Sequence, residues 1–261
     1  MYLRRSVCFI LFILSATASI CAASDPTIGI VWLHGKGGYP SDPYMTGLSN
    51  KMRDSGFLVT APEMPYSKNR QYDKTYQDSA NEIDKEIAYL KGKGAQKIFV
   101  AGLSLGANVA LNYAARTSVD GVLAIAPGHT PESKIMRTRL GSEVERARKM
   151  IQDGQGDKRA MFDDINQGKI SSVSTTANIY FSWFDPDGQA VMPKNAAALK
   201  PGTALLLVIG KKDPLYQAGQ SYVFDKAPPN PNNKYLEVDS DHVDTPTVAA
   251  NDIVNWIKGI K

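Results

Sequence analysis

The residue of this sequence best suited to nucleophilic chemistry is Ser104, at the centre of a Gly-x-Ser-x-Gly pentapeptide, residues 102–106. A short apolar segment rich in strand-forming residues, 97–101, precedes the pentapeptide, and an alanine-rich segment, 107–116, follows it. These compositions predict a buried strand before the serine and a helix after it. So tight a turn strains the serine backbone and presents the hydroxyl above the sheet edge, near the positive end of the helix dipole. The pattern therefore indicates a nucleophilic serine.

A serine hydroxyl needs a base to take its proton, and the base needs a third group to orient it. The chain has three histidines, His34, His129 and His242. For a nucleophile at such a turn, the acid follows the serine in the chain and the histidine follows the acid. His129 comes soon after Ser104, with no acid at a strand end between them, whereas His242 follows the last predicted strand. We therefore predict that His242 is the base.

The third group is predicted to be Asp213, which follows a strongly apolar segment, 204–210, and precedes Pro214. A carboxylate just beyond a buried strand can reach the Nδ1 proton of the histidine. Asp185 and Asp187 are the alternatives, but they follow a less clear strand, in a sequence that is also common in ordinary turns. The sequence leaves these two acids open as second choices.

Residues 1–23 have the layout of a secretory signal peptide, which predicts an exported protein, periplasmic or secreted. Arg4 and Arg5 precede an apolar stretch, 7–20, and small residues follow at 22–23. The apolar stretch is short for a membrane span, so we expect no stable membrane anchor after cleavage. An uncleaved N-terminal anchor is the alternative. Both cysteines, Cys8 and Cys21, lie in this segment, so residues 24–261 contain no disulfide and no cysteine nucleophile.

The composition of residues 24–261 predicts one α/β domain that acts on a small molecule. Without Arg4 and Arg5, the basic residues fall from 30 to 28 against 26 acidic residues, a balance that argues against a nucleic-acid partner. Three scattered histidines give no zinc-ligand spacing, and no calcium-loop, phosphate-loop or dinucleotide motif is present. We expect neither a metal nor a cofactor.

The rest of the chain alternates strand-like and helix-like segments. Apolar runs predict further strands at 27–33, 57–60, 121–126, 204–210 and 234–238, and helices are predicted at 44–54, 77–90 and 247–258. This alternation implies a mostly parallel sheet with helices on both faces. Ligands bind such sheets beyond the carboxyl ends of the strands. Ser104 and the turn at 34–38 both fall at strand ends, so we expect them to face the same crevice.

The longest stretch without a predicted strand lies between 126 and 204, and we expect its residues 131–190 to form a lid insertion. A helix is predicted at 134–151, and no clear strand follows it. Four aromatic residues near the end of the insertion are expected either to line an apolar acyl or aryl site or to pin the lid to the body: Tyr180, Phe181, Trp183 and Phe184. Trp183 and Phe184 are the candidate substrate-binding residues.

Over residues 24–261 the chain resembles the α/β-hydrolase superfamily. The resemblance rests on His34-Gly35-Lys36-Gly37-Gly38, on the pentapeptide at 102–106, on residues 211–214 and on residues 241–242. It implies an α/β-hydrolase fold, a mostly parallel sheet flanked by helices on both faces, with a helical lid insertion. It also implies an oxyanion hole built from the backbone N–H groups of Leu105 and Lys36, with Gly37 as the alternative to Lys36. Two fixed donors there would meet the charge that develops on the carbonyl oxygen.

Together these features predict a serine hydrolase that cleaves carboxylic esters or thioesters through an acyl-enzyme. The turn at 34–38 looks more like that of small esterases and thioesterases than the three-glycine loop of large lipases. Amidase, peptidase or carbon–carbon hydrolase activity would use the same triad and is the closest alternative. A non-catalytic binding protein on a hydrolase scaffold is the alternative from another class, because fold alone does not establish activity.

Overall fold

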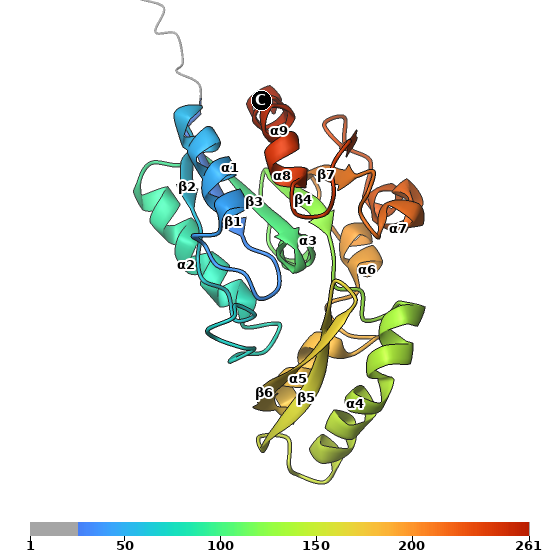
Figure 1. Ribbon diagram of the computed structural model, residues 1–261. Coiled ribbons are helices and arrows are strands. Elements are labelled where there is room, and N and C mark those ends of the chain that lie inside the picture. The colour runs from blue at the N-terminus through green and yellow to red at the C-terminus, as the bar shows by residue number, and fades with distance from the viewer. Residues whose placement is uncertain (1–25, 261) are drawn as a thin grey trace, which may run out of the picture.

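The computed structural model describes residues 26–260, so the predicted signal peptide, residues 1–23, lies outside the described residues. A single sheet of six strands, all parallel, has the order β2-β1-β3-β4-β7-β8 (Figure 1). The carboxyl ends of the strands therefore lie along one edge, as the sequence predicts. The strands are β1 Ile28–Leu33, β2 Leu58–Thr60, β3 Lys97–Ser104, β4 Gly121–Pro127, β7 Ala204–Gly210 and β8 Lys234–Val238.

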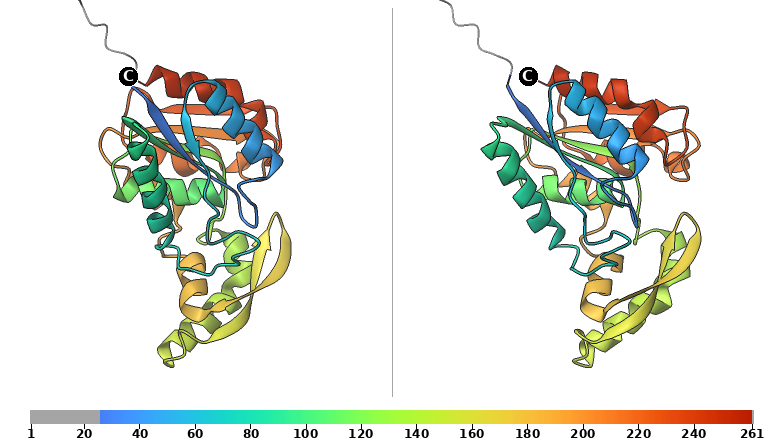
Figure 2. Two further views of the ribbon diagram at one scale, coloured as in Figure 1. Left: turned by 90° about the vertical axis from the view of Figure 1, so that its left-hand side faces the viewer. Right: turned by 60° about the vertical axis from the view of Figure 1, so that its left-hand side comes forward.

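Helices cover both faces of the sheet (Figure 2). Successive residues of a strand point to opposite faces, so Ile30 and Trp32 enter one core while Val31 and Leu33 enter the other. The first core contains the apolar sides of α1 Pro43–Asp54 and α9 Ala250–Gly259, and α8 Thr245–Val248 lies beside α1. The second core is covered by α2 Ser79–Gly92, α3 Leu105–Arg116 and α6 Met192–Ala197. Between β7 and β8 run η1 Tyr216–Ala218, α7 Gln220–Val223 and η2 Phe224–Lys226.

Residues 131–190, called the insertion below, extend beyond the sheet as a separate lobe (Figures 1 and 2). The insertion contains helices, α4 Lys134–Gln152 and α5 Ala177–Phe184, and also an antiparallel hairpin of β5 Arg159–Asn166 and β6 Lys169–Thr176. The sequence predicts no clear strand there. Six of the eight residues of β6 are serine, threonine or lysine, so the apolar alternation of a strand is missing. The hairpin forms around a two-residue turn, with positive φ at Gln167 and Gly168.

The insertion has an aromatic core of its own. Phe162 of β5 is fully buried and stacks on Tyr180, whose ring in turn stacks on Phe184, with centroid separations of 4.4 and 4.3 Å. This core joins the larger of the two sheet cores. The insertion therefore packs continuously against the sheet domain. Among residues 26–260, no helix has the length and apolar character required to cross a membrane.

Candidate active site

Ser104 lies at the end of β3, immediately before α3, with φ 56° and ψ −120°. This backbone conformation is strained for a residue with a side chain, and such strain is characteristic of functional sites. Glycine is required on both sides of the turn. A Cβ on Gly102 would lie 2.1 Å from the carbonyl carbon of Gly106, and a Cβ on Gly106 would lie 2.6 Å from the carbonyl oxygens of Leu33 and His34. The predicted strand-serine-helix turn is present.

The loops after β7 and β8 bring Asp213 and His242 together. The Lys212 N–H donates to the carbonyl of Ser240 at 3.0 Å, which joins the two loops. His242 Nδ1 donates to Asp213 Oδ2 at 2.5 Å, and Asp213 is 4 % exposed. The second carboxylate oxygen accepts the N–H of Leu215 at 2.7 Å. Because Nδ1 carries the hydrogen toward the carboxylate, Nε2 of His242 is the nitrogen with a free lone pair.

The alternative acids lie elsewhere. Asp185 Oδ1 accepts the N–H of Asp187 at 3.1 Å, and the carbonyl of Asp185 accepts the N–H of Gly188. These bonds form the ordinary turn that the sequence allowed. The structure brings Asp213, and neither Asp185 nor Asp187, against His242.

Ser104, Asp213 and His242 all line one cavity of about 170 Å³. Its walls come from the end of β4 and from two parts of the insertion, the start of α4 and the hairpin tip. The other lining residues are Lys36, Pro127, Gly128, His129, Thr130, Ile135, Met136, Ile165, Asn166, Gln167, Gly168, Pro214 and Leu215. A larger hollow of about 520 Å³ lies between α2 and α3 among mainly polar side chains and does not include Ser104. Of these two cavities, the smaller one contains the three predicted triad residues.

The turn after β1 faces the same cavity and supplies a backbone donor. Gly37 N–H donates to the carbonyl of Tyr66 at 2.9 Å, so this N–H is already occupied. No acceptor for the Lys36 N–H is found within residues 26–260. Leu105 is the first residue of α3, a position whose N–H has no partner within the helix. Of the two alternatives for the second donor of the predicted oxyanion hole, the Gly37 N–H is therefore occupied and the Lys36 N–H is not, within the part of the chain that the structure describes.

His34 stabilises this turn through hydrogen bonds of its buried ring. The ring is fully buried, and its Nε2 accepts the N–H of Met64 at 3.0 Å while Nδ1 donates to the carbonyl of Gly35 at 2.7 Å. Burial lowers the pKa of His34, so the ring is neutral, as accepting a hydrogen bond at Nε2 requires. His34 is therefore a structural residue, consistent with its exclusion as the catalytic base.

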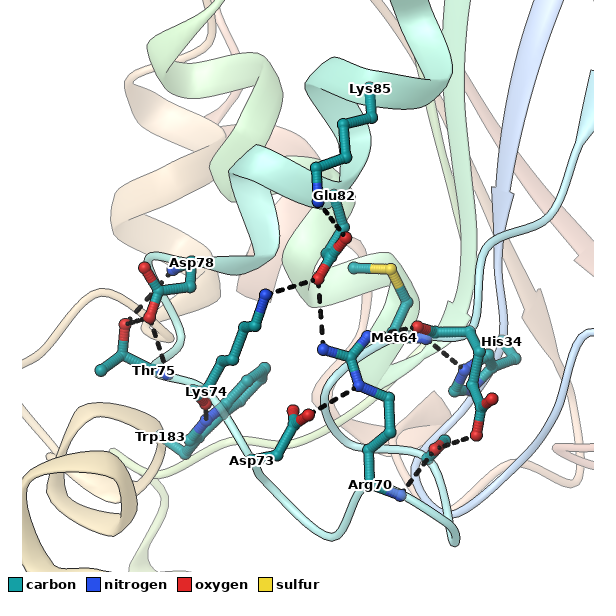
Figure 3. A network of polar contacts seen from close by, with 12 residues as sticks. His34, Met64, Arg70, Asp73, Lys74, Thr75, Asp78, Glu82, Lys85 and Trp183 are labelled. Carbon is teal, nitrogen blue, oxygen red and sulfur yellow. Dashed lines mark hydrogen bonds and ion pairs between the residues drawn. The ribbon is translucent and has the colours of Figure 1, made fainter. Parts of the chain in front are cut away.

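The segment that carries Met64 is itself held by a charged network on α2 (Figure 3). Arg70 donates to the carbonyl of Glu63 at 2.6 Å and to Glu82 at 3.1 Å, and Lys74 and Lys85 also reach Glu82. Burial alone would raise the pKa of Glu82, but these hydrogen bonds outweigh it and lower the pKa to about 2. The network fixes the segment against which His34 and the insertion pack.

The Lys36 side chain connects the turn after β1 to the insertion. Its Nζ lies 2.5 Å from Asp164 Oδ1 and donates to the carbonyl of Ile165 at 3.0 Å, both on β5. Tyr72 O–H donates to the other oxygen of Asp164 at 2.9 Å. The side chains of Lys36 and Asp164 are 8 % and 5 % exposed, so this is a buried ion pair. Asp164 was not among the residues predicted from the sequence, because the hairpin that positions it was not predicted.

The structure does not bring Trp183, a predicted substrate-binding residue, to the cavity of Ser104. Trp183 is fully buried, its indole N–H donates to the carbonyl of Lys74 at 2.9 Å, and it does not line the cavity of Ser104. Three tyrosines surround its ring edge-on at centroid distances of 4.9 to 5.5 Å: Tyr66, Tyr72 and Tyr76. Trp183 thus pins the insertion to the body, which was the alternative interpretation. Phe184 is 2 % exposed and lines a second cavity rather than the one at Ser104.

His129 lines the cavity but is unsuited to act as the base. Its Nε2 donates to the carbonyl of Trp183 at 2.7 Å, and burial, followed by the charge of Lys36, lowers its pKa to about 3. A ring that remains neutral at such low pH cannot store a proton during catalysis near neutrality. Within the described residues, no group of three or more His, Cys, Asp or Glu side chains is arranged to hold a metal ion.

Comparison with known proteins identifies the fold. A family model described as an alpha/beta hydrolase domain matches residues 26–188, more than half of the chain. Among curated proteins, none matches the chain in sequence. Est1E from Butyrivibrio proteoclasticus, solved with bound ferulic acid, is 14% identical over 90% of each chain, with a TM-score of 0.62.

Two further solved structures are similar to a comparable degree. The monoacylglycerol lipase of Paleococcus ferrophilus is 19% identical over 90% of this chain and 97% of that chain, with a TM-score of 0.64. A thermostable carboxyl esterase from Bacillus coagulans, in complex with glycerol, is 15% identical over 90% of this chain and 91% of that chain, with a TM-score of 0.65. At such low identity these similarities establish a shared fold.

Proposed function

This chain belongs to the alpha/beta hydrolase family, and we propose that it is a serine hydrolase that cleaves carboxylic esters or thioesters through an acyl-enzyme. The observation that carries the proposal is the 2.5 Å contact of His242 Nδ1 with Asp213, in a cavity that Ser104 also lines. The proposed roles are Ser104 as nucleophile, His242 as base and then acid, and Asp213 as the group that orients His242.

In the first half-reaction, Ser104 Oγ attacks the carbonyl carbon while His242 Nε2 takes the hydroxyl proton. The negative charge moves to the carbonyl oxygen, where the N–H groups of Leu105 and Lys36 would stabilise it. Collapse of this intermediate breaks the bond to the alcohol or thiol, which leaves with the proton from His242. In the second half-reaction, His242 takes a proton from water, water attacks the acyl carbon, and the acid is released as Ser104 regains its proton.

The ester or thioester preference is supported by the fold relatives whose names include esterase and lipase. An amidase, peptidase or carbon–carbon hydrolase would use the same three residues and remains the second candidate. A substrate panel that spans acyl chain length, thioesters and aryl amides distinguishes these reactions through their kcat/KM values.

The test of the proposal is turnover of p-nitrophenyl acetate and butyrate by wild-type protein and by Ser104→Ala. Turnover should fall to the background rate in Ser104→Ala, while Ser118→Ala, which alters an exposed serine, should retain it. Wild-type protein that fails to hydrolyse any short ester, thioester or amide would contradict the proposal. Equal activity of wild type and Ser104→Ala would do the same.

Export is also proposed, on the composition of residues 1–23. The mature protein should begin after the small residues at 21–23. An N-terminal sequence of the cellular protein that starts at Met1 would contradict this proposal.

A further inference from the structure

A second cavity, of about 280 Å³, lies in the insertion between α4 and the end of α5. Its lining is mainly apolar, and four of its residues are at least nine-tenths buried: Met136, Leu140, Val144 and Phe184. Two exposed side chains of opposite charge, Arg137 and Glu145, complete the lining. Such a site suits an uncharged, apolar group, because the two charges offer no net attraction to an anion.

The second cavity adjoins the cavity of Ser104. Met136 lines both cavities. The ring of Phe184, which lines the second, lies edge-on to the ring of His129, which lines the first, at a centroid distance of 5.1 Å. Methionine is unbranched and adapts its rotamer easily, so Met136 can move aside without disturbing the backbone.

The volumes of the two cavities indicate how large a substrate they could hold together. The cavity at Ser104, about 170 Å³, is below the range of about 300–1,000 Å³ that ligand sites usually occupy. The two cavities together reach roughly 450 Å³, well within that range. The smaller cavity has room for a reacting carbonyl group beside Ser104, and the second offers space for a longer group attached to it.

We propose that the second cavity binds the uncharged aliphatic acyl chain of the substrate, with Met136 as the residue that divides it from the carbonyl site. This inference rests on the proposed function, in which Ser104 attacks an ester or thioester. Burial of each further methylene group should then raise kcat/KM by up to about fourfold, the factor that corresponds to its transfer from water. Octanoyl esters should accordingly be better substrates than acetyl esters.

Gly141 provides a test that preserves the fold. It lies in α4 and lines the second cavity, and a Cβ at this position would meet no atom within 4 Å. The Cβ of Gly141→Leu therefore has open space, its side chain should take up part of the cavity, and the substitution also replaces a poor helix former with a good one. Gly47 of α1 also has open space around its Cβ position, so Gly47→Leu is a matched control remote from the cavity.

The measured quantity is the ratio of kcat/KM for p-nitrophenyl octanoate to that for the acetate. Gly141→Leu should lower this ratio at least tenfold, and Gly47→Leu should leave it within twofold of the wild-type ratio. An unchanged ratio in Gly141→Leu would overturn the inference even if the enzyme is an active esterase.

A binding measurement separates this inference from the proposed function, because it does not require turnover. Octanoic acid should bind Ser104→Ala protein in isothermal titration calorimetry, and binding should weaken at least tenfold in Ser104→Ala/Gly141→Leu. Equal binding to both variants, or no binding to Ser104→Ala, would overturn the second cavity as an acyl-chain site. Wild-type protein without ester turnover would instead contradict the proposed function.

Discussion

The buried ion pair between Lys36 and Asp164 should be a major source of stability, because it joins the turn beside Ser104 to the insertion. We consider Asp164→Asn, which keeps the shape of the side chain and removes its charge. The two side chains are 8 % and 5 % exposed and their charged atoms lie 2.5 Å apart. In the variant, the ammonium group of Lys36 stays buried and loses its counter-ion, although the carbonyl of Ile165 still accepts a hydrogen bond from it.

Removal of one partner from a buried pair typically costs about 3–5 kcal/mol in the free energy of unfolding. For a domain of this size, each kcal/mol lowers Tm by about 2–4 °C, so Asp164→Asn should lower Tm by on the order of 10 °C. The neighbouring Asp163 makes no ion pair among the described residues and bonds to Ser172 near the surface, which makes Asp163→Asn the matched control. Its Tm should change by about 2 °C or less.

Thermal unfolding followed by circular dichroism measures the Tm changes of both variants. A double variant separates loss of the Lys36–Asp164 ion pair from the other effects of each substitution. Lys36→Met/Asp164→Asn should be more stable than the sum of the single variants predicts, because it buries no unpaired ammonium group. If Asp164→Asn melts within 2 °C of the wild type, or if the two substitutions are additive, the pair does not hold the turn. In folded Asp164→Asn protein, kcat should also fall, by up to about 10²-fold, because a looser turn positions the Lys36 N–H less well.

Three other predictions follow from the described contacts. Asp213→Asn should lower kcat by about 10³–10⁴-fold in ester assays, because the wrong tautomer of the catalytic histidine is then favoured. Asp187→Asn should have near-normal kcat. The reverse pattern would assign the orientation of His242 to Asp187 instead. Trp183→Ala should cost about 3–5 kcal/mol in urea unfolding, since it empties a fully buried site, and a loss below 1 kcal/mol would contradict its role as an anchor. Glu82 has its pKa lowered from 4.5 to about 2 in the folded protein, so its stabilising effect is present above pH 4.5 and lost as the pH falls toward 2. The Tm difference between wild type and Glu82→Gln should therefore shrink from pH 6 to pH 3, and a constant difference would argue against the network.

Local sequence signals predicted the sheet and the serine turn. The apolar runs of β1, β3, β4 and β7 are buried strands, and the spacing of Gly102, Ser104 and Gly106 is sufficient to specify the turn. The chain order of serine, acid and histidine favoured His242, and the position of Asp213 directly after an apolar run favoured it over Asp185 and Asp187, which the sequence left open. The family match agrees with the resemblance inferred from these motifs.

Features that depend on long-range packing were not predictable in the same way. The polar sequence of β6 forms a strand because β5 supplies its backbone partners, and this pairing then positions Asp164 against Lys36. Trp183 belongs to a cluster of aromatic residues that the sequence suggested as an apolar binding site, yet three tyrosines from another segment enclose it. The roles of Asp164 and Trp183 depend on which distant segment of the chain packs against them. The sequence of the strand or helix that carries each residue does not reveal this partner.

The central claim is that Ser104 is the nucleophile, and the site of covalent labelling by a fluorophosphonate tests it most directly. Wild-type protein should gain a single adduct, and tandem mass spectrometry of the digest should place it on Ser104. Ser104→Ala should gain none, and Ser118→Ala should label at the wild-type rate. An adduct on another residue, or no adduct on folded wild-type protein, would contradict the account.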